Sequence, residues 1–221
     1  MLKKWLQISF LNLAIVALLG VVMRYKILYP LPFVDQKKFL HAHSHFAFSG
    51  WVTLALMSLL ISRLGNDSNE KAIFRKYRPL LIANLLTAYG MLFSFPFEGY
   101  GLISIIFSTL SIFVSYWFAI QYWRDFNLLP EKKVSSLWFK AGVLFNVISS
   151  AGAFTLACIM ATKSTQTGIY LAAVYFFLHF QYNGWFFFAC MGLLTHKLQY
   201  YAVKKEQLLR IYRLFVYACV P

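Results

Sequence analysis

Six long apolar runs dominate the chain, and polar or charged residues separate them. An α-helix needs about 20 residues to cross the hydrocarbon of a bilayer, and each run is close to that length. We therefore predict an all-α fold, a polytopic transmembrane helix bundle, with spans over residues 5–23, 39–62, 79–97, 102–123, 137–161 and 169–195. A shorter seventh run, 208–221, is expected to be the first part of a further span. Residues 1–221 are predicted to form a single transmembrane domain.

The composition supports this class of protein and excludes others. Hydrophobic residues make up 60% of the chain and charged residues 13%, and the mean hydropathy is +0.62, which is unlike a soluble domain. The net charge of +14 does not indicate a nucleic-acid partner, because the Lys and Arg residues gather between the apolar runs, as in membrane loops. Cys158, Cys190 and Cys219 lie inside apolar runs without a Cys-x-x-Cys spacing, so we expect neither a disulfide framework nor a zinc site.

The positive charges also predict an orientation. If the N-terminus faces the cytoplasm, most Lys and Arg residues, such as Arg63, Arg75 and Lys197, lie in inner segments and far fewer lie outside. We therefore predict an integral membrane protein with a cytoplasmic N-terminus, placed in a bacterial inner membrane. The lipid bilayer is its first expected partner.

Two of the predicted spans share a sequence pattern. Residues 45–60 read HFAFSGWVTLALMSLL and residues 179–194 read HFQYNGWFFFACMGLL, and half of the aligned positions are identical. The copies are four predicted helices apart, and an even number keeps their direction the same, so the pattern indicates a four-helix parallel repeat. From each initial histidine to the next basic residue, Arg63 or Lys197, a helix rises roughly 27 Å. Both histidines are therefore expected at similar depth, in the outer third of the membrane.

The first copy opens with three histidines in HAHSH, residues 41–45. At 100° per residue, His41 and His45 share one helix face, while His43 points almost opposite, toward a loop, water or another helix. A neutral imidazole is a good ligand for haem or a metal ion. Gly50 permits the close approach of a neighbouring helix or a flat macrocycle, and Trp51 is expected to pack inside the bundle.

The second copy places His179 on one face with Asn183, and Tyr182 lies close by. Histidines in membrane spans are also often hydrogen-bonded to a neighbour without any further role. That interpretation is the expected one for His43 and for His196, and for His41 both interpretations stay open. The repeat favours a ligand role for His45 and His179.

With this pattern, the chain resembles the catalytic subunit of haem-copper oxidases and nitric oxide reductases. HAHSHFAFSGW resembles the start of that family's second helix, which carries a ligand of the low-spin haem, and LHFQYNGWFFF resembles its sixth helix, where a histidine binds the non-haem metal. The family's three arcs of four helices match the four-helix offset of the repeat. The resemblance implies that His45, or otherwise His41, binds a low-spin haem.

The same resemblance implies that His179 binds a non-haem metal such as copper or iron, with Gln181, Tyr182 and Asn183 around it. It further implies a role in respiratory electron transfer, with a cytochrome or another electron-donor subunit as partner. The sixth-helix motif departs from the family, because His-Phe-Gln-Tyr-Asn stands where oxidases have His-Pro-Glu-Val-Tyr, and Asn183 stands where nitric oxide reductases have Glu. The family's remaining ligands lie on its helices seven and ten, so these 221 residues alone lack a complete catalytic centre.

Two other classes of function stay open. A non-enzymatic haem or metal sensor, transporter or assembly factor would explain why the sixth-helix motif has lost its Pro and Glu. A membrane di-metal hydroxylase would use HAHSH as a histidine cluster, but only His179 and His196 remain as further histidine ligands.

Overall fold

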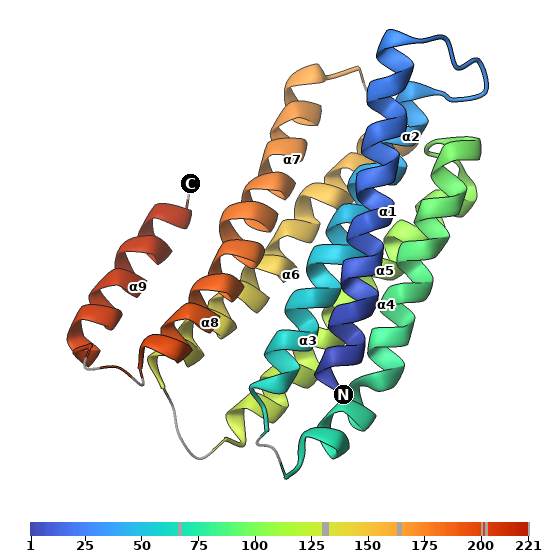
Figure 1. Cartoon of the computed structure of the whole chain (residues 1–221). Coiled ribbons are helices and arrows are strands. Elements are labelled where there is room, and N and C mark those ends of the chain that lie inside the picture. The colour runs from blue at the N-terminus through green and yellow to red at the C-terminus, as the bar shows by residue number, and fades with distance from the viewer. Residues whose placement is uncertain (66–67, 130–132, 163–164, 200, 202, 221) are drawn as a thin grey trace. The chain divides into compact units, whose positions relative to one another are not determined.

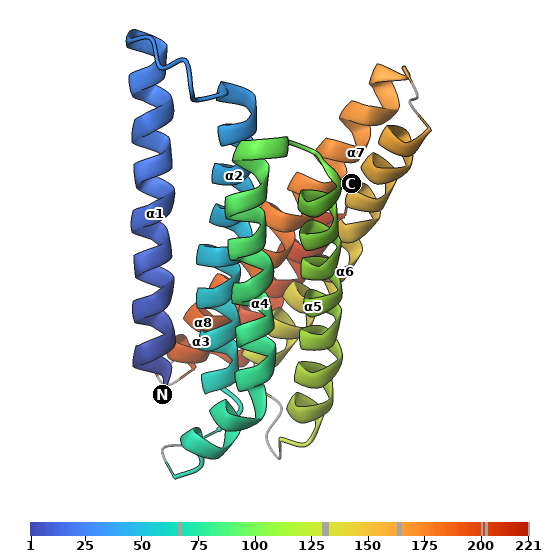
Figure 2. The same cartoon turned by 90° about the vertical axis from the view of Figure 1, so that its right-hand side faces the viewer.

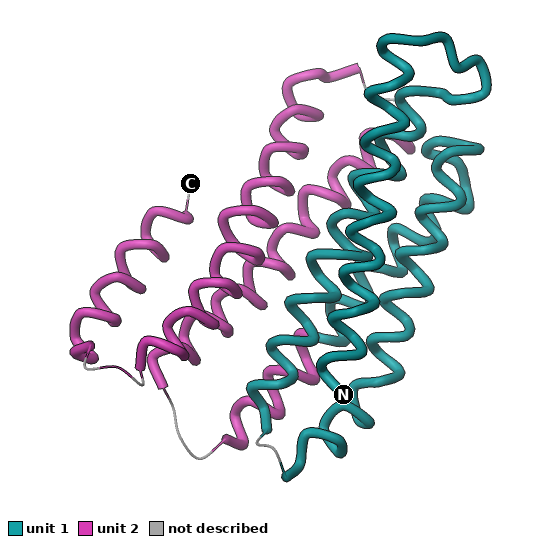
Figure 3. Tube along the Cα trace, viewed as in Figure 1, with its two compact units in different colours: residues 1–118 teal, residues 119–221 magenta. Residues whose placement is uncertain are grey.

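The structure is a computed structural model that describes residues 1–65, 68–129, 133–162, 165–199, 201 and 203–220. This described part is helical and contains no strand, as predicted (Figure 1). The chain forms two compact units, residues 1–118 and 119–221, and the boundary falls inside one helix (Figure 3). The apolar pattern alone predicts one transmembrane domain and carries no signal for this division.

Unit 1 contains the first three spans and most of the fourth. Its elements are α1 (Leu2–Leu28), α2 (Gln36–Phe46), the π-helical segment η1 (Ala47–Thr53), α3 (Leu54–Ser62), α4 (Glu70–Glu98) and the larger part of α5 (Leu102–Asn127). The segments α2, η1 and α3 follow one another without a break and form one continuous helix. Figures 1 and 2 show α2 beside α4, and α1 packs along α2, η1 and α3.

Unit 2 contains the end of α5 together with α6 (Val134–Ala161), α7 (Thr167–His179), the π-helical segment η2 (Phe180–Phe186), α8 (Phe187–Leu198) and α9 (Lys205–Cys219). Again α7, η2 and α8 run on as one helix, which packs along α6. Gly184 permits this packing, because a Cβ atom at this position would lie only 2.6 Å from the Cβ atom of Phe145 on α6.

Five helices in the described part are long and apolar enough to cross a membrane: Leu2–Leu28, Gln36–Ser62, Glu70–Glu98, Leu102–Asn127 and Val134–Ala161. They correspond to the first five predicted spans. The sixth predicted span forms the continuous α7–η2–α8 helix but is not among the five, because His179, Gln181 and Asn183 interrupt its apolar run. The predicted partial seventh span is the helix α9, which begins three residues earlier than expected, at Lys205.

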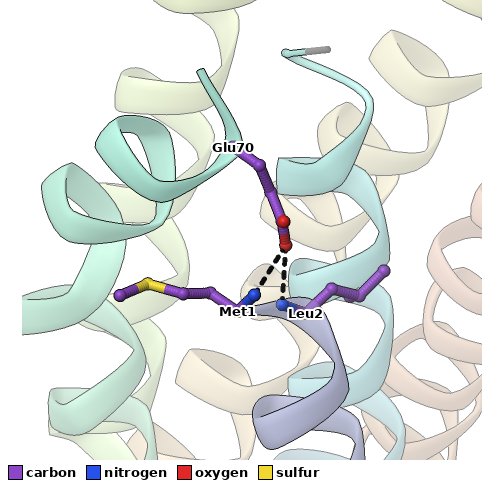
Figure 4. A network of polar contacts seen from close by, with 3 residues as sticks. All are labelled: Met1, Leu2 and Glu70. Atoms are coloured by element: carbon purple, nitrogen blue, oxygen red, sulfur yellow. Dashed lines mark hydrogen bonds and ion pairs between the residues drawn. The ribbon is translucent and has the colours of Figure 1, made fainter. Parts of the chain in front are cut away.

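Polar contacts fix the ends of the unit 1 helices. The N-terminal amine of Met1 and the backbone N–H of Leu2 both donate to Glu70 Oε1 at 2.9 Å (Figure 4). This carboxylate joins the start of α1 to the start of α4, so the first and third spans run in the same direction. Asp35 caps α2 by accepting from the backbone N–H groups of Lys37 and Lys38 at 2.9 and 3.0 Å.

Candidate functional site

Each copy of the sequence repeat contains a π-helical segment just after its histidine. The segment η1 begins at Ala47, two residues beyond His45, and η2 begins at Phe180, directly after His179. In a π-helix each N–H bonds to the carbonyl five residues earlier, which widens the turn, and such segments occur frequently at functional sites. The two segments fall at equivalent positions of the repeat to within one residue. The sequence repeat therefore has a counterpart in backbone geometry.

Buried side chains of α1 and α4 hold the backbone of η1. Three consecutive carbonyl oxygens accept hydrogen bonds: Ser49 O from Asn84 Nδ2 at 3.0 Å, Gly50 O from Asn12 Nδ2 at 2.6 Å, and Trp51 O from Ser9 Oγ at 3.0 Å. The amide oxygen of Asn12 also accepts from the hydroxyl of Tyr89 at 2.7 Å. A widened turn interrupts the regular hydrogen bonds between backbone groups four residues apart. The side chains of Ser9, Asn12 and Asn84 donate hydrogen bonds to the carbonyl oxygens at this turn.

His41 and His45 lie together against two aromatic rings of unit 1. The His45 ring stacks on Phe95 at a centroid distance of 4.5 Å, and its Nε2 lies 3.3 Å from the hydroxyl of Tyr100. The His41 ring lies 4.5 Å from the Tyr100 ring, and its Nε2 is buried without a hydrogen-bond partner in the described part of the chain. The predicted shared face of these two histidines is therefore confirmed, and one imidazole nitrogen on it accepts or donates no hydrogen bond among the described residues.

His43 points away from this cluster, as the helical spacing predicts. Its Nδ1 lies 3.0 Å from the carbonyl oxygen of Val16 on α1. The imidazole packs on α1 beside Gly20, one turn further along, where a Cβ atom would lie 3.5 Å from its Cε1, an ordinary van der Waals distance. The predicted neighbouring helix is thus α1, and His43 joins α1 to α2.

His179 uses both ring nitrogens within unit 2. Nδ1 lies 3.2 Å from Asn183 Nδ2, and Nε2 lies 2.8 Å from the backbone oxygen of Cys219 on α9. An imidazole that accepts at Nδ1 and donates at Nε2 satisfies both contacts as one neutral tautomer. The predicted neighbourhood with Asn183 is confirmed, but a metal ion at Nε2 would have to replace the bond to Cys219.

The remaining predicted neighbours of His179 have separate environments. Gln181 points into unit 2, where its Nε2 donates to Asn146 Oδ1 at 3.0 Å and to Ser149 Oγ at 2.7 Å. Tyr182 is exposed and its ring contacts Phe186 edge-on. These two side chains therefore do not gather around the imidazole.

Gly50 and Trp51 have local structural roles. A Cβ atom at Gly50 would lie 2.6 Å from the ring of Phe46, so this glycine makes room for a side chain of its own helix rather than for a neighbouring helix. Trp51, which the sequence predicts to pack inside the bundle, is half-buried in unit 1, whereas its counterpart in the repeat, Trp185, is fully buried in unit 2.

Neither histidine segment forms a complete metal site on its own. Among the described residues, no group of three or more His, Cys, Asp and Glu side chains could hold a metal ion. The histidine cluster that a di-metal hydroxylase needs is thus not assembled in this part of the chain. The sequence did not predict two features of the site. These are the contacts of Phe95 and Tyr100 with the histidines, and the side chains that bind the backbone of η1.

The fold and the apolar helices define the class of protein, which is a helical integral membrane protein. No protein-family model matches the chain, and no curated protein or solved structure shows significant similarity to it.

Proposed function

We propose that the chain is a haem-binding protein of the bacterial inner membrane, related to haem-copper oxygen and nitric oxide reductases, with a role in respiratory electron transfer. The observation that carries the proposal is His41, whose Nε2 is buried without a hydrogen-bond partner in the described part of the chain. A neutral imidazole with one unused nitrogen is what axial ligation of haem iron requires. The N-terminus is proposed to face the cytoplasm, because the basic residues then lie mostly on the inner side.

The aromatic side chains around His41 suit this role. Phe95 is fully buried and Tyr100 lies against the rings of both His41 and His45. The buried Phe95 ring excludes water on its side, and the two rings together limit the rotation of the imidazoles. When bound, haem supplies an iron centre that can accept and release one electron, and a cytochrome or another donor subunit would deliver that electron.

His41 and His45 are alternatives for one axial position. They lie one turn apart on the same face, so they cannot hold an iron atom from opposite sides. The repeat register favours His45. The contacts favour His41, because its Nε2 has no hydrogen-bond partner among the described residues, whereas Nε2 of His45 lies near Tyr100. Any second protein ligand of the haem iron would have to come from outside this pair.

A non-haem copper or iron ion at His179 gains no support from the contacts of that side chain, since both ring nitrogens are engaged. We therefore propose that His179 joins η2 to α9. This favours the second candidate function, a non-enzymatic haem sensor, transporter or assembly factor. Haem binding without consumption of oxygen or nitric oxide by the purified protein would select that candidate.

The test is optical. The protein, expressed with haem supply and purified in detergent, is expected to show a Soret band and a haem-to-protein ratio near one. His41→Gln should lose most of the bound haem if His41 is the ligand, and His45→Gln should do so if His45 is.

The matched control is His43→Gln, which removes an imidazole from the opposite face of the same helix and should leave the haem content unchanged. A wild-type protein without a Soret band would refute the proposal. Equal haem retention in the His41 and His45 variants would refute the assignment of the ligand.

A further inference from the structure

A small pocket in unit 2 combines positive charge with an apolar wall. It has a volume of about 150 Å³ and lies where the end of α5, the first turns of α6 and the start of α9 meet. Lys133, Lys140 and Lys205 line it together with Ser136, and the apolar side chains of Phe126 and Leu209 complete its wall. The three lysines among the described lining residues give the pocket positive charge, which attracts an anion.

Lys140 is held in place at this pocket. Its ammonium group donates to Asn127 Oδ1 at 2.7 Å and lies 5.2 Å from the centre of the Trp123 ring. An ammonium group has three donors, and the contact with Asn127 uses one of them. An anion can therefore be bound by the remaining donors without releasing Lys140 from its present contacts.

The location and chemistry of the pocket define the kind of anion. The pocket lies at the first turns of α6, which is long and apolar enough to cross a membrane. Leu137, one of its lining residues, is exposed, and the adjoining α9 exposes Leu214 and Phe215. A ligand with a negative head and apolar tails matches lysines that are flanked by exposed apolar side chains at the end of a membrane span.

We propose that this pocket binds the phosphate group of an anionic phospholipid, with the acyl chains lying against the apolar surface beside it. Lys133 and Lys205 approach the phosphate from two different helix starts, and Lys140 supplies the fixed third charge. The serine hydroxyl of Ser136 lines the same space and can donate to a phosphate oxygen. This site is independent of the histidine cluster in unit 1 and does not rest on haem binding.

Native mass spectrometry of delipidated protein in detergent tests the proposal. The wild-type protein, titrated with phosphatidylglycerol or with phosphatidylcholine, is expected to bind the anionic lipid more tightly. Each lysine near an anionic headgroup contributes on the order of a fivefold change in affinity, so Lys133→Gln with Lys205→Gln should weaken phosphatidylglycerol binding at least about tenfold.

The control carries Lys71→Gln and Lys204→Gln, which remove two exposed lysines that do not line the pocket, one of them adjacent to Lys205. It should bind phosphatidylglycerol like the wild type. A far-ultraviolet circular dichroism melt establishes that both double variants are folded. Equal loss in both double variants would overturn the proposal, because only net charge would then matter. Displacement of the lipid by an equal concentration of inorganic phosphate would also overturn it, in favour of a general anion site.

Discussion

Asn12 is the side chain on which the polar contacts of η1 most depend. It is fully buried, its Nδ2 donates to Gly50 O at 2.6 Å, and its Oδ1 accepts from the Tyr89 hydroxyl at 2.7 Å. Replacement by Leu keeps a similar volume but removes both bonds. The Gly50 carbonyl oxygen then lacks this donor, and the Tyr89 hydroxyl lacks this acceptor.

The size of the effect follows from these two bonds. Interhelical hydrogen bonds in membranes contribute about 0.6 kcal/mol on average and up to about 1.7 kcal/mol. Asn12→Leu is therefore expected to lower the free energy of unfolding by about 1–3 kcal/mol. Tyr89→Phe alone should cost about 1 kcal/mol, but in the Asn12→Leu background it should cost nothing or restore some stability, because it removes a hydroxyl without its partner.

Reversible unfolding in mixed detergent micelles, followed by circular dichroism, measures these differences. Ser44→Ala is the control, because within the described part of the chain the Ser44 hydroxyl donates only to the carbonyl oxygens of Leu40 and His41 in its own helix. It should change stability by less than about 0.5 kcal/mol. Additive effects of the Asn12 and Tyr89 substitutions would refute the reasoning, since two residues that share a hydrogen bond must be energetically coupled.

Two further predictions concern packing and a helix start. Gly184→Val should destabilise unit 2 by about 1–3 kcal/mol, because its Cβ would lie 2.6 Å from that of Phe145. At Gly168 an added Cβ would meet no described atom within 4 Å beyond its chain neighbours and the nearby backbone of its own helix, so Gly168→Ala should not lower stability in thermal unfolding. At Asp35, the hydrogen bond from the Lys38 backbone N–H lowers the pKa below its ordinary value of 3.8. The stabilisation is present above that value and is lost as the pH falls through the lowered pKa, so Asp35→Ala should flatten the pH dependence of stability in acid, and an unchanged slope would contradict this assignment.

The sequence was sufficient to predict the helices and to predict which histidines of residues 41–45 share a helix face. Apolar runs of about 20 residues predict helices, because a helix of that length crosses the hydrocarbon and satisfies every polar backbone group within the segment. The 100° spacing also correctly separated His43, which contacts α1, from His41 and His45. Local periodicity was sufficient there because residues 41–45 lie in regular α-helix.

The partners of the histidines could not be predicted in the same way. Tyr100 is far from His41 in the chain, and only the turn at Gly99, with its φ of 64°, brings its ring back to α2. The contact of His179 with Cys219 likewise depends on where α9 packs in unit 2. Such contacts between distant segments leave no periodic signal in the sequence.

The widened turn in η1 has a consequence for experiments that probe the helix one residue at a time. One additional residue in a turn rotates everything beyond it by roughly 100° relative to a regular α-helix. A cysteine-accessibility scan from Gln36 to Ser62 should thus show labelled positions that recur with the helical period of about 3.6 residues up to Ala47. After Thr53 the same period should continue, but with its phase shifted by one residue. Deleting a single residue within this interval would realign the two phases and leave the inward-facing side chains of α3 facing inward, because a regular α-helix would then cover the same turns.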